Sequence, residues 1–274
     1  MKDWQAEKQW YTKNKLAKRQ IWYADVAADY ERVRQRYPDS LIDGAIAAAG
    51  LSPQAHLLEI GCGPGIATCA WADRGYQLTC IEPNSRFYAI MQSKCALYPQ
   101  VQVENVAFEQ WTVQPGQFDA VLAANSLHWV EQDVAYLKAA QALRPGGHLV
   151  ELFHLTPEPN PWVFELLRPA YAALPPWFAY EGETIQRINI EGLGQELLDS
   201  GYFQDLVVEI TPWSQLYNTT DYLALLGTLS TYIRLTALER DRLFKQLQFL
   251  IDTELGGEVE VFNLCAFQVG TRID

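Results

Sequence analysis

Hydrophobic positions form short runs that alternate with longer mixed stretches through the middle of the chain. The runs predict strands at 56–60, 77–82, 101–106, 118–124 and 148–153, and the stretches predict helices at 39–50, 66–74, 84–98 and 133–143. Apolar strands that alternate with helices indicate a parallel sheet with helices on both faces, because such strands are buried on each side. The pattern therefore predicts an α/β fold with a Rossmann-like, doubly wound sheet.

The alternation stops after residue 153 and resumes in a different form. Residues 154–180 are rich in proline and aromatic side chains and fit no further strand–helix unit. Beyond them the pattern predicts helices at 194–200, 220–235 and 238–255, and strands at 203–211 and 258–269. The sequence TALE at 236–239 has the form of a capping box at a helix start. Gly256 and Gly257 indicate a turn, after which we expect the last strand to return antiparallel along the sheet edge.

Composition and charge limit the partners and the compartment. The chain has 274 residues, is 49% apolar and carries a formal charge of −12, which argues against nucleic acid because phosphates require a basic face. The N-terminus has no signal-peptide core, and no apolar run is long enough for a membrane span. Five cysteines without a CxxC pair and only four histidines predict neither a zinc site nor a disulfide framework. We therefore expect a cytoplasmic protein with no metal, no nucleic-acid partner and no membrane partner, while its oligomeric state stays open.

The sequence HLLEIGCGPGIAT at 56–68 carries the strongest chemical signal. Gly61, Gly63 and Gly65 fall on alternate positions between a predicted strand and a predicted helix. Because glycine lacks Cβ, the backbone at the carboxyl end of a strand can approach a ligand there and turn sharply into the helix. An ordinary tight turn is the alternative, but it does not require three alternating glycines. The stretch therefore predicts a ligand site at this end of the sheet.

Two acids near the glycines indicate the kind of ligand. The spacing is GxGxG, and Ile66 stands where the dinucleotide motif GxGxxG has its third glycine. Glu59 precedes the glycines, where a carboxylate would repel a pyrophosphate but bind an ammonium group. Glu82 ends the second strand, where an acid can accept both hydroxyls of a ribose. A ligand with a nucleoside at one end and an amino acid at the other fits, and S-adenosylmethionine is such a ligand.

Four motifs in order resemble those of the class I S-adenosylmethionine-dependent methyltransferases. They are LEIGCGPG, IEPN (81–84), FDAVLAANSLHWV (118–130) and ALRPGGHLV (142–150). YERVRQRYPDSL and YNTTDYLALLGTLS also resemble the methyltransferase type 11 subgroup, which includes trans-aconitate methyltransferase-like proteins. The resemblance covers most of residues 26–269 and implies a seven-stranded sheet with the last strand antiparallel. It implies one overall domain with three parts: a helical lid (1–37), a cofactor-binding core (38–153) and the remaining strands with helical substrate-side insertions (154–274).

The resemblance also implies the cofactor contacts. They are Glu59, Gly61, Cys62, Gly63, Gly65, Glu82, Pro83, Asn84, Ala107, Phe108, Ala123, Ala124 and Asn125. In this arrangement the glycines face the methionine and ribose, Glu82 holds the ribose hydroxyls, and residues 123–125 lie near the sulfonium. Many relatives carry Asp then Ala where this chain has Ala107–Phe108, and that Asp binds the adenine amino group. Here the hydrogen bond has to come from Glu109 or the backbone, with Phe108 as a ring contact.

The stretch LHWV (127–130) follows the fourth predicted strand and contains the candidate catalytic residues. His128 is a candidate general base for an acceptor that carries a proton, or else a structural residue of the turn. Trp129 resembles the tryptophan with which plant and insect carboxyl methyltransferases bind a substrate carboxylate, although it is equally suited to form a pocket wall. Because relatives use the N-terminal segment as a lid, the candidate substrate contacts are Gln20, Trp22 and Tyr30, together with Trp129.

These observations predict an S-adenosylmethionine-dependent methyltransferase that acts on a small-molecule acceptor. Transfer from a sulfonium mainly requires that the nucleophile and the methyl group be aligned and water excluded. A carboxylate is already ionised at neutral pH, so we favour oxygen as the acceptor atom and a carboxylate as the acceptor group. Four arginines are candidate partners for an anionic acceptor, and the sequence does not rank them: Arg34, Arg86, Arg187 and Arg234. The alternatives are a non-catalytic S-adenosylmethionine-binding protein and, less favoured because of Ile66 and Glu59, a NAD-dependent dehydrogenase.

Overall fold

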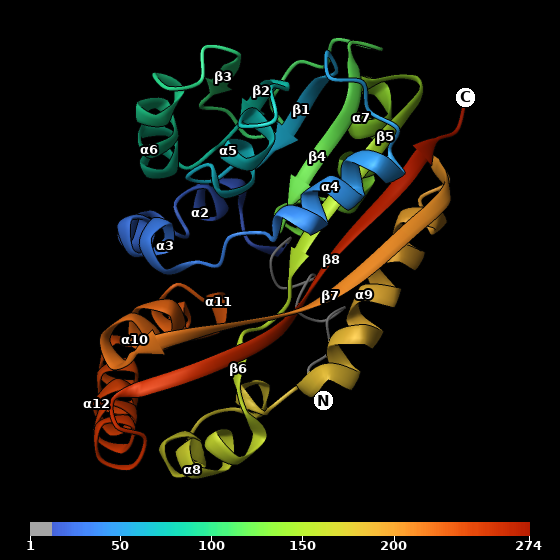
Figure 1. Cartoon of the computed structure of the whole chain (residues 1–274). Helices are drawn as coiled ribbons and strands as arrows, with labels where there is room; N and C mark the ends of the chain where they lie inside the picture. Colours follow the sequence, from blue (N-terminus) through green and yellow to red (C-terminus); the bar gives the residue numbers. More distant parts are fainter. Residues whose placement is uncertain (1–12) are drawn as a thin grey trace.

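The centre of the molecule is a mostly parallel sheet, seen in Figure 1 of the computed structural model, which describes residues 13–274. Its parallel strands are β1 (His56–Ile60), β2 (Gln77–Ile81), β3 (Val101–Glu104), β4 (Phe118–Ala124) and β5 (Leu143–His154). The strand order is β3-β2-β1-β4-β5, and the last strand, β8 (Glu258–Arg272), pairs antiparallel with β5. β7 (Phe203–Asn218) covers the other edge of β8. The predicted doubly wound sheet with its antiparallel last strand is therefore confirmed. Besides the seven predicted strands, the short β6 (Glu158–Pro159) pairs with β8, so the described sheet has eight strands.

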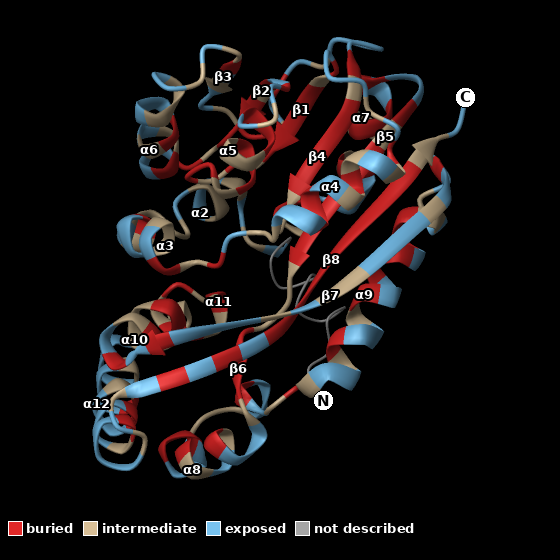
Figure 2. Ribbon diagram, viewed as in Figure 1, coloured by how far each residue is buried: buried red, intermediate tan, exposed pale blue. Residues whose placement is uncertain are grey.

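Two layers of helices cover the sheet. The helices are α4 (Asp39–Ala48), α5 (Ile66–Ala72), α6 (Ser85–Cys95), α7 (Gln132–Ala142) and α9 (Gly182–Asp199). Successive residues of β1 enter different clusters: Leu57 packs with side chains of α4 and α5, whereas Leu58 packs with side chains of α7. Burial on both faces accounts for the nearly continuous apolar runs of β1 and β4, which Figure 2 shows as buried along most of their length.

The second half of the chain differs from the predicted pattern in its lengths. β7 is longer than the apolar run at 203–211, because it pairs with β8 past the end of β5. β8 begins at the predicted residue and continues to Arg272, toward the start of β5. The helix predicted at 194–200 is the end of an 18-residue helix, α9. β5 begins at Leu143 and not at the predicted residue 148. The RPGG sequence is part of the strand and does not form a turn in front of it. The proline-rich segment contains a two-residue strand, β6 (Glu158–Pro159), and a helix, α8 (Pro161–Tyr171).

The far ends of β7 and β8 support a second group of helices, below the sheet in Figure 1. This group contains α8, α10 (Thr219–Gly227), α11 (Ser230–Ile233), α12 (Ala237–Glu254) and the 3-10 turn η3 (Pro176–Phe178). Its side chains form a separate cluster that includes Leu167, Tyr222 and Leu247. The helix predicted over 220–235 is divided into α10 and α11, and the predicted capping box at Thr236 opens α12. We call this group the lower lobe.

A lid segment, residues 16–37, connects the two groups of helices. It contains α2 (Leu16–Gln20), the 3-10 turn η1 (Ala24–Val26) and α3 (Ala27–Val33), so the helix expected near the N-terminus is broken into short pieces within the described part. Figure 1 places α2 and α3 between the carboxyl ends of the parallel strands and the lower lobe. The remainder of the predicted lid, residues 1–12, lies outside the described residues.

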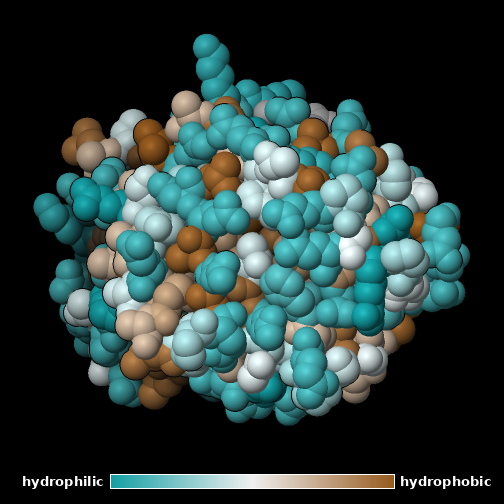
Figure 3. Space-filling view, turned by 90° about the horizontal axis from the view of Figure 1, so that it is seen from above, coloured by the Kyte–Doolittle hydropathy of each residue, from teal (hydrophilic) through white to brown (hydrophobic). Residues whose placement is uncertain are grey.

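The surface agrees with the composition. In Figure 3 the upper face is mainly hydrophilic, with hydrophobic side chains in small separate groups. Within residues 13–274, no helix has the length and apolar character needed to cross a membrane. All five cysteines are in the free thiol form.

Candidate functional site

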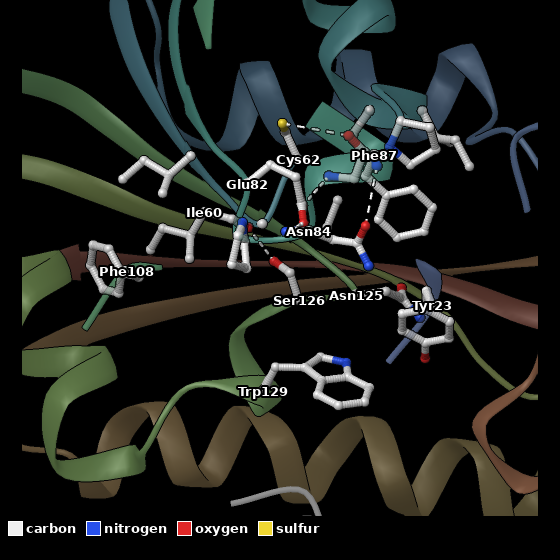
Figure 4. A pocket seen from close by; sticks show the side chains of 18 of the residues that line it. Tyr23, Ile60, Cys62, Glu82, Asn84, Phe87, Phe108, Asn125, Ser126 and Trp129 are labelled. Atoms are coloured by element: carbon white, nitrogen blue, oxygen red, sulfur yellow. Dashed lines mark hydrogen bonds between the residues drawn. The ribbon is translucent and has the colours of Figure 1, made fainter. Parts of the chain in front are cut away.

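A cavity opens at the carboxyl ends of β1, β2 and β4, where the sheet order reverses between β1 and β4. This is where open α/β sheets bind ligands, because the connections from neighbouring strands leave in opposite directions. The wall of this first cavity is formed by the turns at 60–64, 81–84, 107–109 and 124–126, and by the lid segment. In Figure 4, Cys62 and Glu82 lie across the hollow from Tyr23 and Trp129, with Asn125 and Ser126 between them.

The three glycines of the first turn have left-handed backbones, but different surroundings. A Cβ at Gly61 would lie 2.8 Å from the Cβ of Ser126, and one at Gly65 would lie 2.4 Å from the Sδ of Met91. A Cβ at Gly63 would meet no atom within 4 Å, at a φ of +57°. Gly61 and Gly63 line the first cavity, whereas Gly65 does not. Gly65 therefore allows α5 to pack against α6, and the backbone of Gly61 and Gly63 faces the ligand space.

Glu82 is the buried acid of the first cavity. Its carboxylate accepts hydrogen bonds from the backbone N–H groups of Gly63 (2.8 Å) and Asn84 (2.7 Å), one on each oxygen. Burial raises the pKa of Glu82 to about 7, although these two hydrogen bonds oppose the rise. Each carboxylate oxygen has a second lone pair, so the group can still accept two hydroxyl donors. The side chain predicted to hold ribose hydroxyls is fixed in place on the cavity wall.

Glu59 lies elsewhere, beneath the glycine turn. Its side chain is fully buried, accepts a hydrogen bond from the Oγ1 of Thr68 (2.6 Å) and is not part of the cavity wall. Burial raises the pKa of Glu59 to about 7. The structure therefore does not bring this carboxylate to the surface that a bound ammonium group would touch.

The side predicted to bind adenine is formed by Pro83, Asn84, Ala107 and Phe108, all of which line the cavity. Glu109 also lines it, and its carboxylate forms an ion pair with Arg19 of the lid segment at 2.8 Å. The same guanidinium donates to the backbone oxygen of Trp129. Lid and core are thus joined next to Ala107 and Phe108.

An aromatic cluster closes the cavity from the lid side. The ring of Tyr23 contacts those of Tyr30, Phe87 and Trp129 at centroid distances of 5.4 to 6.0 Å, and each of these side chains lines the cavity. Gln20 lines it as well. Trp22 does not, and instead packs against Trp129 at 6.3 Å. Trp129, which ends the 3-10 turn η2 (Leu127–Trp129), is therefore a wall of the first cavity.

A second cavity adjoins the first and lies between the sheet and the lower lobe. Tyr23, Tyr30, Arg34, Asn125 and His154 line both cavities. Other parts of its wall are aromatic, and come from residues Phe153, Phe164, Tyr171, Phe178, Tyr222 and Tyr232. His128 lines the second cavity but not the first, so the two candidate catalytic residues of the LHWV stretch face different spaces.

Asn125 and His154 hold the boundary between the cavities. Asn125 has a positive φ of 49°, and its side chain donates to the oxygen of His154 (2.8 Å) and accepts from its N–H (2.7 Å). The His154 imidazole contacts the Sγ of Cys265 (3.1 Å from Nδ1) and the oxygen of Arg36 (3.3 Å from Nε2). Burial lowers the pKa of His154 to about 3, so the ring is neutral. A neutral ring with both nitrogens engaged serves to connect β5, β8 and the lid.

The structure gathers most of the predicted residues and adds several. The predicted cofactor contacts that line the first cavity are Gly61, Cys62, Gly63, Glu82, Pro83, Asn84, Ala107, Phe108, Ala124 and Asn125. Those that do not are Glu59, Gly65 and Ala123. Sequence reasoning missed Tyr23, Phe87, Ser126 and His154; only Ser126, which directly follows Asn125, had a positional signal. The other three belong to segments with no recognisable motif.

Comparisons with known proteins show similarity in the part of the chain that forms the first cavity. Residues 58–150 match the family model described as methyltransferase domain. An uncharacterized methyltransferase of Mycobacterium bovis is 30% identical over 144 residues, which are 53% of this chain and 56% of that protein. A ubiquinone biosynthesis O-methyltransferase of Xanthomonas campestris is 36% identical over 111 residues, which are 38% of this chain and 45% of that protein. The chain thus spans about half the length of the curated relatives it matches.

A solved structure shares the fold over most of the chain. It is described as a putative type II methyltransferase from Anaeromyxobacter dehalogenans, with a TM-score of 0.61 and 20% identity. The match covers 87% of this chain and 97% of that chain.

Proposed function

Residues 58–150 belong to the methyltransferase type 11 family, and on that premise we propose that this protein is an S-adenosylmethionine-dependent methyltransferase of a small-molecule acceptor. The observation that carries the proposal is the pairing of Gly63 with Glu82. The N–H of a cavity-lining glycine is bonded to a buried carboxylate at the end of the next strand. A glycine backbone next to an acid is the combination that an adenosyl ligand with a free ribose requires.

The residues of the first cavity fit this cofactor. The Gly61–Gly63 backbone leaves room for the methionine part, and Glu82 can accept the two ribose hydroxyls. Phe108 and Pro83 provide an apolar surface for adenine, and Glu109 stands beside them. When bound, the cofactor supplies a methyl group that its sulfonium already activates. The cluster around Tyr23 and Trp129 encloses this position and excludes water.

The second cavity is the proposed acceptor site. It meets the first at Tyr30, Arg34 and Asn125, so an acceptor there would face the cofactor across these side chains. The similarity to an O-methyltransferase supports oxygen as the acceptor atom. A carboxylate needs no general base, so His128 is required only if the acceptor carries a proton. We therefore favour a carboxylate acceptor.

The two alternatives have less support. A non-catalytic S-adenosylmethionine-binding protein requires only the first cavity, whereas here an aromatic second cavity opens beside it. A NAD-dependent dehydrogenase requires space for a pyrophosphate on a GxGxxG turn, and this chain has Ile66 at the third position.

The Glu82→Gln variant tests the cofactor site. We expect its affinity for S-adenosylhomocysteine, measured by isothermal titration calorimetry, to fall about 10- to 100-fold, because a charged hydrogen-bond acceptor is worth about 1.5–3 kcal/mol. Glu82→Ala should abolish binding, although it also leaves the N–H groups of Gly63 and Asn84 without their acceptor. Melting temperatures of both variants show whether the fold is retained.

Glu104→Gln is the matched control, since Glu104 ends the neighbouring strand β3 on the surface and outside the first cavity. Its affinity for S-adenosylhomocysteine should equal that of the wild type. Equal affinity in a folded Glu82→Gln variant would disprove the role of Glu82. Absence of any binding by the wild type would disprove the proposed function.

A further inference from the structure

Arg34 lies where the two cavities meet and differs in this from the other candidate arginines. It lines both cavities. Arg86 is exposed, and Arg187 forms a surface ion pair with Glu183 at 2.7 Å. Arg86, Arg187 and Arg234 are absent from the walls of both cavities. The structure thereby ranks the four cations that the sequence left equal.

The guanidinium of Arg34 is anchored along one edge. Its Nε donates to the Oγ1 of Thr228 (2.8 Å) and its Nη2 donates to the backbone oxygen of Thr228 (2.6 Å). Thr228 is fully buried, and its hydroxyl also donates to the oxygen of Leu225 at the end of α10 (2.7 Å). The guanidinium also lies 4.5 Å from the ring centroid of Tyr30. The position of this cation is therefore fixed from two sides before any acceptor binds.

The anchoring leaves a defined set of donors. A guanidinium has five N–H donors, and Thr228 uses one on Nε and one on Nη2. Within residues 13–274, no further hydrogen bond or ion pair to Arg34 is formed. The remaining donors include one N–H on Nη1 and one on Nη2, and these two N–H groups point in parallel away from the end of the guanidinium. Parallel N–H groups are the geometry that binds both oxygens of a carboxylate.

We propose that the acceptor is an aromatic monocarboxylic acid whose carboxylate is bound end-on by Arg34. The inference rests on the proposed function and specifies the substrate class. The aromatic side chains of the second cavity suit a planar apolar body. Two acids on the same wall, Glu158 and Glu181, would repel a second carboxylate of the acceptor. Glu158 is held there by the N–H groups of Glu181 and Gly182 at the start of α9.

The reaction balances without an added base. A lone pair of one carboxylate oxygen forms the new O–C bond to the methyl carbon, and the C–S bond breaks with its electron pair going to sulfur. The products are a methyl ester and S-adenosylhomocysteine, and no proton is transferred. The ester is neutral, so it lacks the charge-assisted hydrogen bonds that the acid makes to Arg34. It therefore binds more weakly than the acid and dissociates after the reaction.

The test compares acids with neutral analogues on the full-length protein. Cinnamate and indole-3-acetate should be converted to methyl esters, detected by mass spectrometry, whereas cinnamide and cinnamyl alcohol should not react. Arg34→Met should raise KM for the acids about 10- to 100-fold, and Arg34→Lys should restore part of the loss. The affinity of both variants for S-adenosylhomocysteine should change much less than KM, because Glu82 and the glycine turn hold the cofactor on the opposite side of the first cavity. Arg187→Met is the matched control, because Arg187 lies on the surface of α9, and its KM should not change.

The outcomes separate this inference from the proposed function. Methylation of cinnamyl alcohol or cinnamide at rates equal to those of the acids would disprove the inference but not the proposed methyltransferase function. An unchanged KM for the acids in Arg34→Met would have the same meaning. If S-adenosylhomocysteine binds but neither acid binds the complex in calorimetry or reacts, the substrate class is wrong. Failure of the wild type to bind S-adenosylhomocysteine would remove the proposed function and the inference with it.

Discussion

Glu59 and Glu82 end neighbouring strands, and burial raises the pKa of both to about 7. Their surroundings separate their roles. Glu82 is held by two backbone N–H groups on the cavity wall, whereas Glu59 bonds to Thr68 inside the core. The first carboxylate is available to a ligand. The second joins β1 to α5, and its effect is on stability.

Glu59 predicts a pH dependence of the free energy of unfolding. The folded state keeps the proton up to about pH 7, whereas the unfolded state loses it near its ordinary pKa of 4.5. The stabilisation is therefore complete below about pH 4.5 and is lost as the pH rises through 7. We expect Glu59→Gln to reduce the loss of stability between pH 5 and pH 8 by about 1–3 kcal/mol, measured by urea unfolding. Parallel pH profiles of the variant and the wild type would contradict the assignment.

At the scale of elements, the antiparallel β7–β8 pair and α12 determine whether the second cavity exists. The pair extends beyond β5 and carries α10 and α11, whose Tyr222 and Tyr232 line that cavity. α12 packs its buried Leu243, Leu247 and Ile251 into the same cluster. The acceptor side therefore depends on helices that lie far from the glycine turn in the sequence.

The first turn of α12 provides a test at this scale. The Oγ1 of Thr236 accepts from the N–H of Glu239 (3.3 Å), and the carboxylate of Glu239 accepts from the N–H of Thr236 (2.9 Å). Thr236→Ala should lower the free energy of unfolding by about 1 kcal/mol in urea denaturation. Thr253→Ala, near the other end of the same helix, removes an exposed hydroxyl that bonds back to Phe249 and should have a smaller effect. An equal loss in the two variants would argue against the cap.

Over the whole molecule, the lid segment links the sheet to the lower lobe through both cavities. Arg19 pairs with Glu109 of the core, while the hydroxyl of Tyr23 lies 2.7 Å from the Oγ of Ser230. The hydroxyl of Tyr217 donates to the backbone oxygen of Val33 (2.9 Å). A ligand in the first cavity would therefore contact groups held by both parts of the molecule.

This arrangement predicts a large thermal shift on ligand binding. S-adenosylhomocysteine at 100 times its Kd should stabilise the folded state by about 2.7 kcal/mol and raise Tm by about 5–10 °C for a chain of this size. The same concentration should shift Glu82→Gln much less, and Arg187→Met as much as the wild type. A wild-type Tm that is independent of S-adenosylhomocysteine, in differential scanning fluorimetry, would contradict a cofactor site in the first cavity.

The sequence by itself determined the parallel sheet, the glycine turn and the acid at the end of β2. These depend on local patterns, since strand burial, left-handed glycines and strand ends all leave marks within a few residues of the chain. The length of β7 was underestimated, because most of its side chains after residue 211 are exposed or half-buried and form no apolar run.

Only the tertiary structure decided which side chains share a space. Glu59 and Glu82 are similar acids at strand ends, yet one is enclosed by helix packing and the other faces the cavity. Arg34 could not be separated from three other arginines, because its importance comes from Thr228, nearly 200 positions away in the chain. Contacts between distant segments depend on how helices and strands pack together, and no local pattern records that packing.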